Sequence, residues 1–108
     1  MDDQEFKTEA DRVLTALYRK LAAASDDSSF EADFNAGALT IEFDDAPAKF
    51  VISPNSPVRQ IWVSAHSRSF KLDWDREAND FVLPETHQTL TQLIEKAIGQ
   101  QLGEEVTL

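Results

Sequence analysis

The chain has 108 residues, no cysteine and a formal net charge of −10, from 20 acidic and 10 basic side chains. This length suits a single domain over residues 1–108, and the lack of cysteine excludes disulfides, thiolate zinc sites and iron–sulfur clusters held by the chain's own thiolates. The acidic surplus, and the absence of any apolar run near the ~20 residues that span a bilayer, argue against nucleic acid and membranes as partners, so we expect a cytoplasmic protein.

The first predicted element is an amphipathic helix from roughly Asp3 to Ala24. Its apolar residues recur at helical spacing and form one stripe: Phe6, Ala10, Val13, Leu14, Leu17 and Leu21. Such a stripe is typical of a helix that packs one side against a core. The polar segment from Ser25 to Ser29 is expected to end it.

Two alternating segments, 30–34 and 39–43, predict an antiparallel hairpin with one buried face. A turn centred on Ala36 and Gly37 matches apolar residues on one side of the hairpin, pairing Phe34 with Leu39, Ala32 with Ile41 and Phe30 with Phe43. A three-residue loop would instead place Phe30 opposite Glu42. We therefore predict the first register.

The rest of the chain predicts further short strands and a second helix. Strands are expected over Ala48 to Ile52, from about Val58, over Ser69 to Trp74 and over Phe81 to Leu83, with Pro54 and Pro57 delaying the second of these. The second helix has an apolar stripe, with Thr86 or Thr89 as its cap and Gly103 just beyond its end; the stripe consists of Leu90, Leu93, Ile94, Ala97, Ile98 and Leu102.

This order of elements, with short connections, predicts the fold class α+β. We expect a two-layer α-β sandwich in which an antiparallel sheet of five to six strands carries the N- and C-terminal helices on one face. Two helices can cover only one face of such a sheet. The other face is therefore expected to be open to water or to a partner.

Trp62 is predicted to lie on that open face. Ile61, Val63 and Ala65 form the cleaner core phase of their strand, so the period of two places Trp62 and Gln60 on the opposite side. The alternative is an ordinary core or edge tryptophan. An exposed tryptophan on an uncovered sheet favours a docking surface, because tryptophan is enriched at interface hot spots.

An acidic block is the second unusual feature. Between Ala22 and Ala48 the chain has no Lys or Arg and seven acidic residues, which are Asp26, Asp27, Glu31, Asp33, Glu42, Asp44 and Asp45. The predicted register sets Glu31 directly opposite Glu42 and places Asp33 on the same face, and like charges so placed repel. A metal ion or a basic patch on another protein would relieve this repulsion; the alternative is a solvated face that only increases solubility.

Carboxylate oxygens without imidazole or thiolate suit hard ions such as ferric iron, Ca²⁺, Mn²⁺ or Mg²⁺, and exposed carboxylates predict weak binding. A catalytic centre is not indicated. His66 and His87 stand alone, and the sequence contains no nucleophile elbow and no glycine-rich phosphate loop. We expect a binding protein rather than an enzyme, with no catalytic residues and no organic cofactor.

Several segments resemble the frataxin family, specifically its bacterial CyaY members, over essentially the whole chain. They are "EADFNAGALTIEF" behind an acidic first helix, "PVRQIWVSA" followed by "FKLDWD", and the closing "LTQLIEKAIGQQLGEEV". The most specific string is Pro57-x-x-Gln60-Ile61-Trp62. Lys7, where a bacterial relative can offer histidine, and Ser53, where asparagine is common, depart from the family pattern.

The resemblance implies an iron-binding protein that takes part in iron–sulfur cluster assembly and contacts the cysteine desulfurase and the scaffold protein. It implies weakly bound Fe²⁺ or Fe³⁺ and an acidic ridge that here comprises Asp3, Asp27, Glu31 and Asp33. With the rest of the acidic block, the predicted metal-binding residues are Asp3, Asp27, Glu31, Asp33, Glu42, Asp44 and Asp45. The predicted partner-binding residues are Glu31, Asp33, Gln60 and Trp62.

Our leading hypothesis is an iron-responsive regulator of the desulfurase and scaffold machinery. We expect a monomer, with metal-dependent oligomers as an alternative. Two rival functions stay open: an acidic interaction module in which metal binding is incidental, and an iron-oxidising enzyme.

Overall fold

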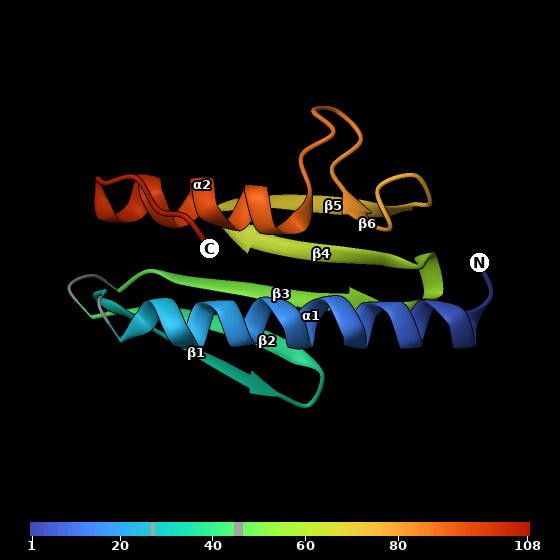
Figure 1. The fold of residues 1–108 in the computed structure, drawn as a ribbon, viewed down its shortest axis with the longest axis horizontal. Coiled ribbons are helices and arrows are strands. Elements are labelled where there is room, and N and C mark those ends of the chain that lie inside the picture. Colours follow the sequence, from blue (N-terminus) through green and yellow to red (C-terminus); the bar gives the residue numbers. More distant parts are fainter. Residues whose placement is uncertain (27, 45–46) are drawn as a thin grey trace.

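The computed structural model describes residues 1–26, 28–44 and 47–108 and consists of a sheet and two helices (Figure 1). Helices α1 (Asp3–Ser25) and α2 (Leu90–Leu102) lie side by side over the same face of the sheet. The strands are β1 (Phe30–Asn35), β2 (Ala38–Phe43), β3 (Lys49–Asn55), β4 (Gln60–Ala65), β5 (Arg68–Asp75) and β6 (Asp80–Val82). Neighbouring strands are antiparallel and follow chain order, so β1 and β6 form the two edges. The predicted α+β sandwich is confirmed.

Both helices begin with a side chain that satisfies a free backbone N–H group. In α1, Asp2 Oδ1 accepts a 2.7 Å hydrogen bond from the Glu5 N–H. In α2, Thr89 and Gln92 form a reciprocal capping box, so Thr89, rather than Thr86, is the cap. Gly103 ends α2 with a φ of 73°, as expected for its position. Neither helix combines the length and the apolar character needed to cross a membrane, within the residues described.

The predicted register of the first hairpin is confirmed. Phe34 lies opposite Leu39, and Glu31 lies opposite Glu42. The turn residues Ala36 and Gly37 have φ values of 54° and 81°. These left-handed conformations give a two-residue turn whose twist matches that of the flanking strands.

The middle of the sheet differs from the prediction in its boundaries. Strand β3 extends to Asn55 and so contains Pro54, whereas we expected it to end at Ile52. Proline is tolerated there because the pairing of β3 with β2 ends at Ile52, which leaves Pro54 with a partner strand on one side only. A single turn of 3-10 helix, η1 (Ser56–Val58), then carries the chain to β4.

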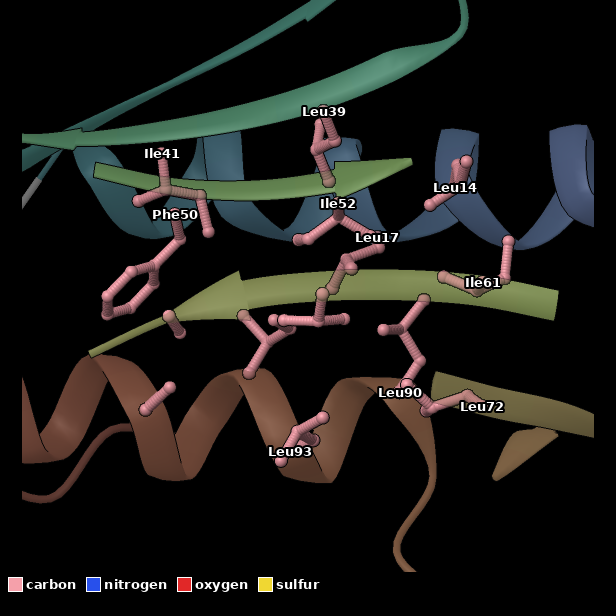
Figure 2. Close-up of a cluster of buried hydrophobic side chains, with 14 of the residues drawn as sticks. Leu14, Leu17, Leu39, Ile41, Phe50, Ile52, Ile61, Leu72, Leu90 and Leu93 are labelled. Carbon is pink, nitrogen blue, oxygen red and sulfur yellow. The ribbon is translucent and has the colours of Figure 1, made fainter. Parts of the chain in front are cut away.

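The core lies between the sheet and the two helices (Figure 2). Leu14 and Leu17 of α1 approach the sheet from one side of this space, and Leu90 and Leu93 belong to α2. The sheet contributes buried side chains from its central strands, namely Leu39, Ile41, Phe50, Ile52, Ile61, Val63 and Leu72. Trp74 is partly buried against this cluster, with its ring centroid 5.2 Å from that of Phe81.

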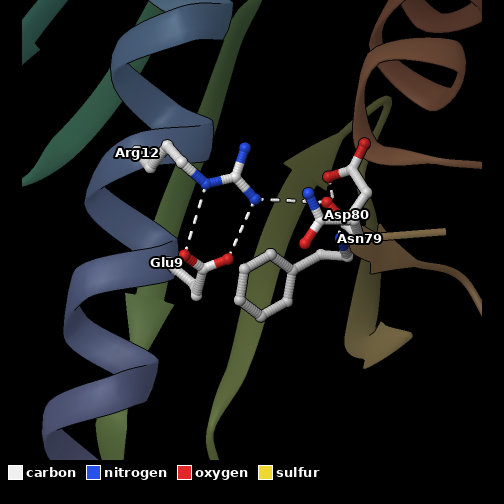
Figure 3. A network of polar contacts seen from close by, with 5 residues as sticks. Glu9, Arg12, Asn79 and Asp80 are labelled. Carbon is white, nitrogen blue, oxygen red and sulfur yellow. Dashed lines mark hydrogen bonds and ion pairs between the residues drawn. The ribbon is translucent and has the colours of Figure 1, made fainter. Parts of the chain in front are cut away.

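A polar network joins α1 to the turn between β5 and β6 (Figure 3). Arg12 donates two hydrogen bonds to the Glu9 carboxylate, at 2.9 and 3.3 Å, and a third of 3.2 Å to the Asn79 carbonyl. The hydrogen bond to Glu9 raises the pKa of Arg12 above its ordinary value. A charged, forked side chain therefore connects two elements that are far apart in the sequence.

Asp80 lies beside this network and is partly buried. Burial raises the pKa of Asp80 above its ordinary value, although the Phe81 N–H, Arg12 and Lys20 act in the opposite direction. The folded protein therefore holds the Asp80 proton more tightly than the unfolded chain does. The stability linked to this group is complete below the unfolded pKa and is lost as the pH rises through the folded pKa.

We expect Asp80→Asn to stabilise the protein at pH 7, with a rise in Tm on the order of 2 °C. Asparagine removes the partly buried charge and keeps the oxygen that accepts the 2.8 Å hydrogen bond from the Phe81 N–H. The gain should shrink as the pH falls through the raised pKa of Asp80, because the wild-type carboxyl then becomes neutral as well. Thermal unfolding at several pH values, with the exposed Glu77→Gln as the control for net charge, measures the effect. An equal gain in both variants at every pH would contradict it.

Candidate functional site

The face of the sheet opposite the helices carries both features singled out in the sequence. Trp62 lies on this open face and is 38% exposed, which confirms its predicted orientation. Its neighbours in the strand, Ile61 and Val63, are buried on the helix side. Among the described residues, Trp62 and Val58 are the large apolar side chains with the most exposed surface.

The indole of Trp62 is held by contacts on two sides. Its Nε1–H donates a 3.0 Å hydrogen bond to Gln60 Oε1, and Gln60 Nε2 donates one of 2.9 Å to Asp73 Oδ1 on the neighbouring strand. Lys71, directly opposite Trp62, places its Nζ 4.9 Å from the centre of the indole ring. These contacts favour one orientation of an exposed aromatic side chain, which lowers the entropy cost of binding.

A shallow hollow of about 360 Å³ lies beside the indole on the open face. Its lining includes Trp62 and Lys71 together with the small side chains of Ser53, Ser64 and Ser69. Small residues around an exposed tryptophan leave room for a side chain of a partner. The hollow and the indole together therefore form a suitable docking point for another protein.

The carboxylates gather at the other end of the open face, on β1 and β2. Glu31 lies directly opposite Glu42, Asp33 lies opposite Thr40, and all three acidic side chains are exposed. Lys49 of β3 follows Glu42 in the same cross-strand row. The chain thus supplies one cation of its own next to the glutamate pair, which reduces the repulsion expected from the acidic residues alone.

The remaining predicted metal-binding residues are dispersed. Asp3 lies in the first turn of α1, at the opposite end of this helix from the start of β1, and pairs with Lys7 at 3.2 Å. Asp44 is exposed just after β2, where its N–H donates a 2.9 Å hydrogen bond to the Ser29 carbonyl. Asp27 and Asp45 lie outside the described residues. Glu31, Glu42 and Asp33 are thus the predicted residues that the structure brings onto neighbouring strands of one face.

Three side chains of this site were missed in the sequence. Lys71 and Asp73 contact Trp62 and Gln60 because β5 pairs with β4 through a two-residue turn at His66 and Ser67. Lys49 lies one position beyond the stretch that lacks basic residues. The alternation of residues 69–74 shows which of these side chains share a face, but the register between strands is needed to show which of them touch.

The carboxylates fit a hard cation in chemistry but offer few ligands at one point. Within the described residues, no group of three His, Asp or Glu side chains lies close enough to hold one metal ion. The facing pair of Glu31 and Glu42 could provide two carboxylate ligands to an ion such as iron, and water would have to complete the coordination. Ligands of this number and exposure are suited to a weakly held, exchangeable ion.

Comparison with known proteins adds a family and a fold. Residues 1–104 match the family model of the frataxin-like domain. Among solved structures, the fold is similar to that of frataxin from Psychromonas ingrahamii, a model for stability modulation within the CyaY protein family. The TM-score is 0.81, the match covers 98% of this chain and 96% of that chain, and the sequences are 24% identical.

We expect Gln60→Ala to release the Trp62 indole, because the substitution removes the acceptor of its N–H hydrogen bond. The indole N–H signal of Trp62 should move upfield in a ¹H–¹⁵N spectrum, while the loss in stability should stay below about 1 kcal/mol because the bond is exposed. The indole signal of Trp74 serves as the internal control. Asp73→Ala, which leaves the acceptor in place, should shift the Trp62 signal less. An unchanged Trp62 signal in Gln60→Ala would show that this hydrogen bond is absent in solution.

Proposed function

The chain belongs to the frataxin-like family, and from this premise we propose that it is an iron-binding regulator of the cysteine desulfurase and scaffold machinery. Membership of the family supports a role in iron–sulfur cluster assembly. The finer proposal has two parts. The open face of the sheet docks on the desulfurase–scaffold assembly through Trp62, and the carboxylates of β1 and β2 bind iron and contact a basic patch of the desulfurase.

The observation that carries this proposal is that the fixed indole and the carboxylates share one uncovered face. Asp33 on β1 and Trp62 on β4 are three strand spacings apart, which is about 14 Å across the sheet. A protein interface of ordinary size buries about 800 Å² on each partner and can easily cover both. One partner, or two partners bound next to each other, can therefore contact the apolar and the acidic parts simultaneously.

Charge gives each part of this face a separate role in binding. The exposed carboxylates act over several ångströms in water and speed the approach of a basic surface, an effect that salt weakens. The indole acts at contact, where burial of an aromatic side chain stabilises the complex. Mutation of the acidic residues should therefore change mainly the association rate, and mutation of Trp62 mainly the dissociation rate.

In this proposal iron binds to the same carboxylates. A bound ferrous or ferric ion reduces the negative charge that a basic partner meets at Glu31 and Glu42. Binding of iron and binding of the desulfurase are then coupled, and the coupling free energy is the same in both directions. This coupling would make a binding protein responsive to iron without any catalytic step.

Anaerobic titration of ferrous iron into the ¹⁵N-labelled protein tests the metal role. We expect the paramagnetic ion to broaden the amide signals of Glu31, Asp33 and Glu42 at lower iron concentrations than those of Glu104 and Glu105, which are exposed acids on the C-terminal segment. The affinity should be weak and should fall with added salt. Simultaneous broadening of both groups would indicate non-selective attraction of the cation to an acidic surface and would contradict an iron site.

Binding to the purified cysteine desulfurase tests the docking role. We expect Trp62→Ala to weaken the complex about 30-fold, the effect of a hot-spot residue worth about 2 kcal/mol. The double variant Glu31→Lys and Asp33→Lys should slow association in iron-free buffer. Glu104→Lys with Glu105→Lys is the matched control, since it changes the net charge equally at another place.

These outcomes separate the proposal from its nearest rival, a docking module in which iron plays no part. If the double variant on β1 lost desulfurase binding but kept normal iron-induced broadening at Glu42, the carboxylates would serve the partner alone. If Trp62→Ala bound as tightly as the wild type, the open face would not be the docking surface.

A further inference from the structure

The edge of the sheet farthest from the acidic residues is only half covered. Strand β6 pairs with residues Asp73 to Asp75 of β5, whereas β5 itself begins at Arg68. The first part of β5, residues 68–72, therefore has β4 on one side and no strand on the other. The chain leaves this edge at Leu83, where a turn closed by a 2.8 Å hydrogen bond from the His87 N–H to the Leu83 carbonyl leads it away from the sheet before α2 (Figure 1).

The pairing pattern shows which backbone groups this edge exposes. His66 and Ser67 form a two-residue turn with φ values of 53° and 62°, so Arg68 and Ala65 are a hydrogen-bonded pair. Hydrogen-bonded and non-bonded pairs alternate along an antiparallel ladder, which directs the N–H and C=O groups of Ser69 and Lys71 away from β4. In the described part of the chain, no backbone or side-chain group forms a hydrogen bond with these outward groups.

A groove of about 530 Å³ runs along this same edge. Strand β5 forms one wall with residues Arg68 to Lys71, and the segment 83–88 and α2 form the others. Leu83 and Leu93 contribute apolar surface to the groove. The free part of β5 beside this groove is five residues long and could pair with an extended segment of similar length.

The charge of the groove is opposite to that of the protein. Arg68 and Lys96 line it and Lys71 stands at its β5 wall, against one acidic residue, Glu85. The whole chain has twice as many acidic as basic side chains. A basic groove on an acidic protein favours an acidic occupant.

We propose that this edge of β5 is a second docking site, which binds an extended acidic peptide segment of a partner protein as an additional strand. The backbone of the peptide would pair with the outward N–H and C=O groups of Ser69 and Lys71. Side chains alternate along the peptide, so acidic side chains of one phase would meet Arg68 and Lys96 on the helix side, and side chains of the other phase would lie beside Lys71 on the open face. This is the β-strand addition mode of peptide recognition, in which main-chain hydrogen bonds give affinity and side-chain contacts give specificity. The site lies across the sheet from Glu31 and Glu42 and does not depend on their proposed role.

Titration of the ¹⁵N-labelled protein with a synthetic capped hexapeptide of alternating glutamate and valine tests this proposal. We expect the amide signals of Ser69 and Lys71 to shift most and their hydrogen exchange to slow. A peptide with lysine in place of glutamate should bind at least 10-fold more weakly. A glutamate peptide N-methylated at alternate residues cannot pair fully with a strand, and it should also bind at least 10-fold more weakly. This comparison requires no mutation of the protein.

The double variant Arg68→Glu and Lys96→Glu should lose binding of the glutamate peptide. The matched control, Arg19→Glu with Lys20→Glu on the exposed side of α1, should retain this binding. Equal binding of the methylated and unmethylated peptides would overturn strand addition. No shift at millimolar peptide would overturn the site itself. If inorganic phosphate produced the same shifts at Ser69 and Lys71, the groove would be a general anion site and the proposal would be wrong.

Discussion

The structure depends on one constraint, which is that two helices can bury only one face of a six-stranded sheet. In the sheet the aliphatic side chains of the central strands, such as Ile41, Ile52 and Ile61, point toward α1 and α2 and are fully buried. Because side chains alternate along a strand, every buried residue fixes the side of its neighbours. The exposure of Trp62 and Glu42 is thus a direct consequence of the core. A shift of one residue in either strand would bury these polar and amphipathic groups and expose the aliphatic ones, at a cost of several kcal/mol.

Much of the fold follows from this alternation and could be predicted from the sequence. The hairpin from Phe30 to Phe43 was predicted in the correct register because only one register matches apolar residues across the strands. The outward orientation of Trp62 followed in the same way. The predicted end of β3 at Ile52 was wrong. Proline usually breaks a strand, and the sequence does not show that Pro54 lies beyond the last pair of β3 with β2.

The site was less predictable than the fold, because its contacts cross between strands whose register was not predicted from the sequence. Lys71 reaches the Trp62 ring, and Asp73 reaches Gln60, through the register of β4 with β5. Lys49 adjoins Glu42 through the register of β2 with β3. Apolar matching fixes the buried side of a strand pair, whereas a polar row becomes visible only after that register is known. Asp3 was included in the acidic ridge because of the family resemblance, and its distance from Glu31 is set by the length of α1 and not by strand pairing.

The distribution of charge suggests why one small sheet could carry two separate docking surfaces. The acidic residues of β1 and β2 lie at one edge of the sheet, and the basic residues Arg68 and Lys96 line a groove near the other. A basic partner is attracted to the first edge and repelled from the second, and an acidic segment experiences the reverse. Trp62 lies between them on the open face and is held by Gln60 of its own strand and by Lys71 of β5. A partner that covered Trp62 from the β1 side would leave the β5 edge free, because that edge is reached in the plane of the sheet and not through its face. Two partners could therefore bind at once, with Lys71 as a side chain that both would approach. Each partner would affect the binding of the other through Lys71 and through the charges that it neutralises.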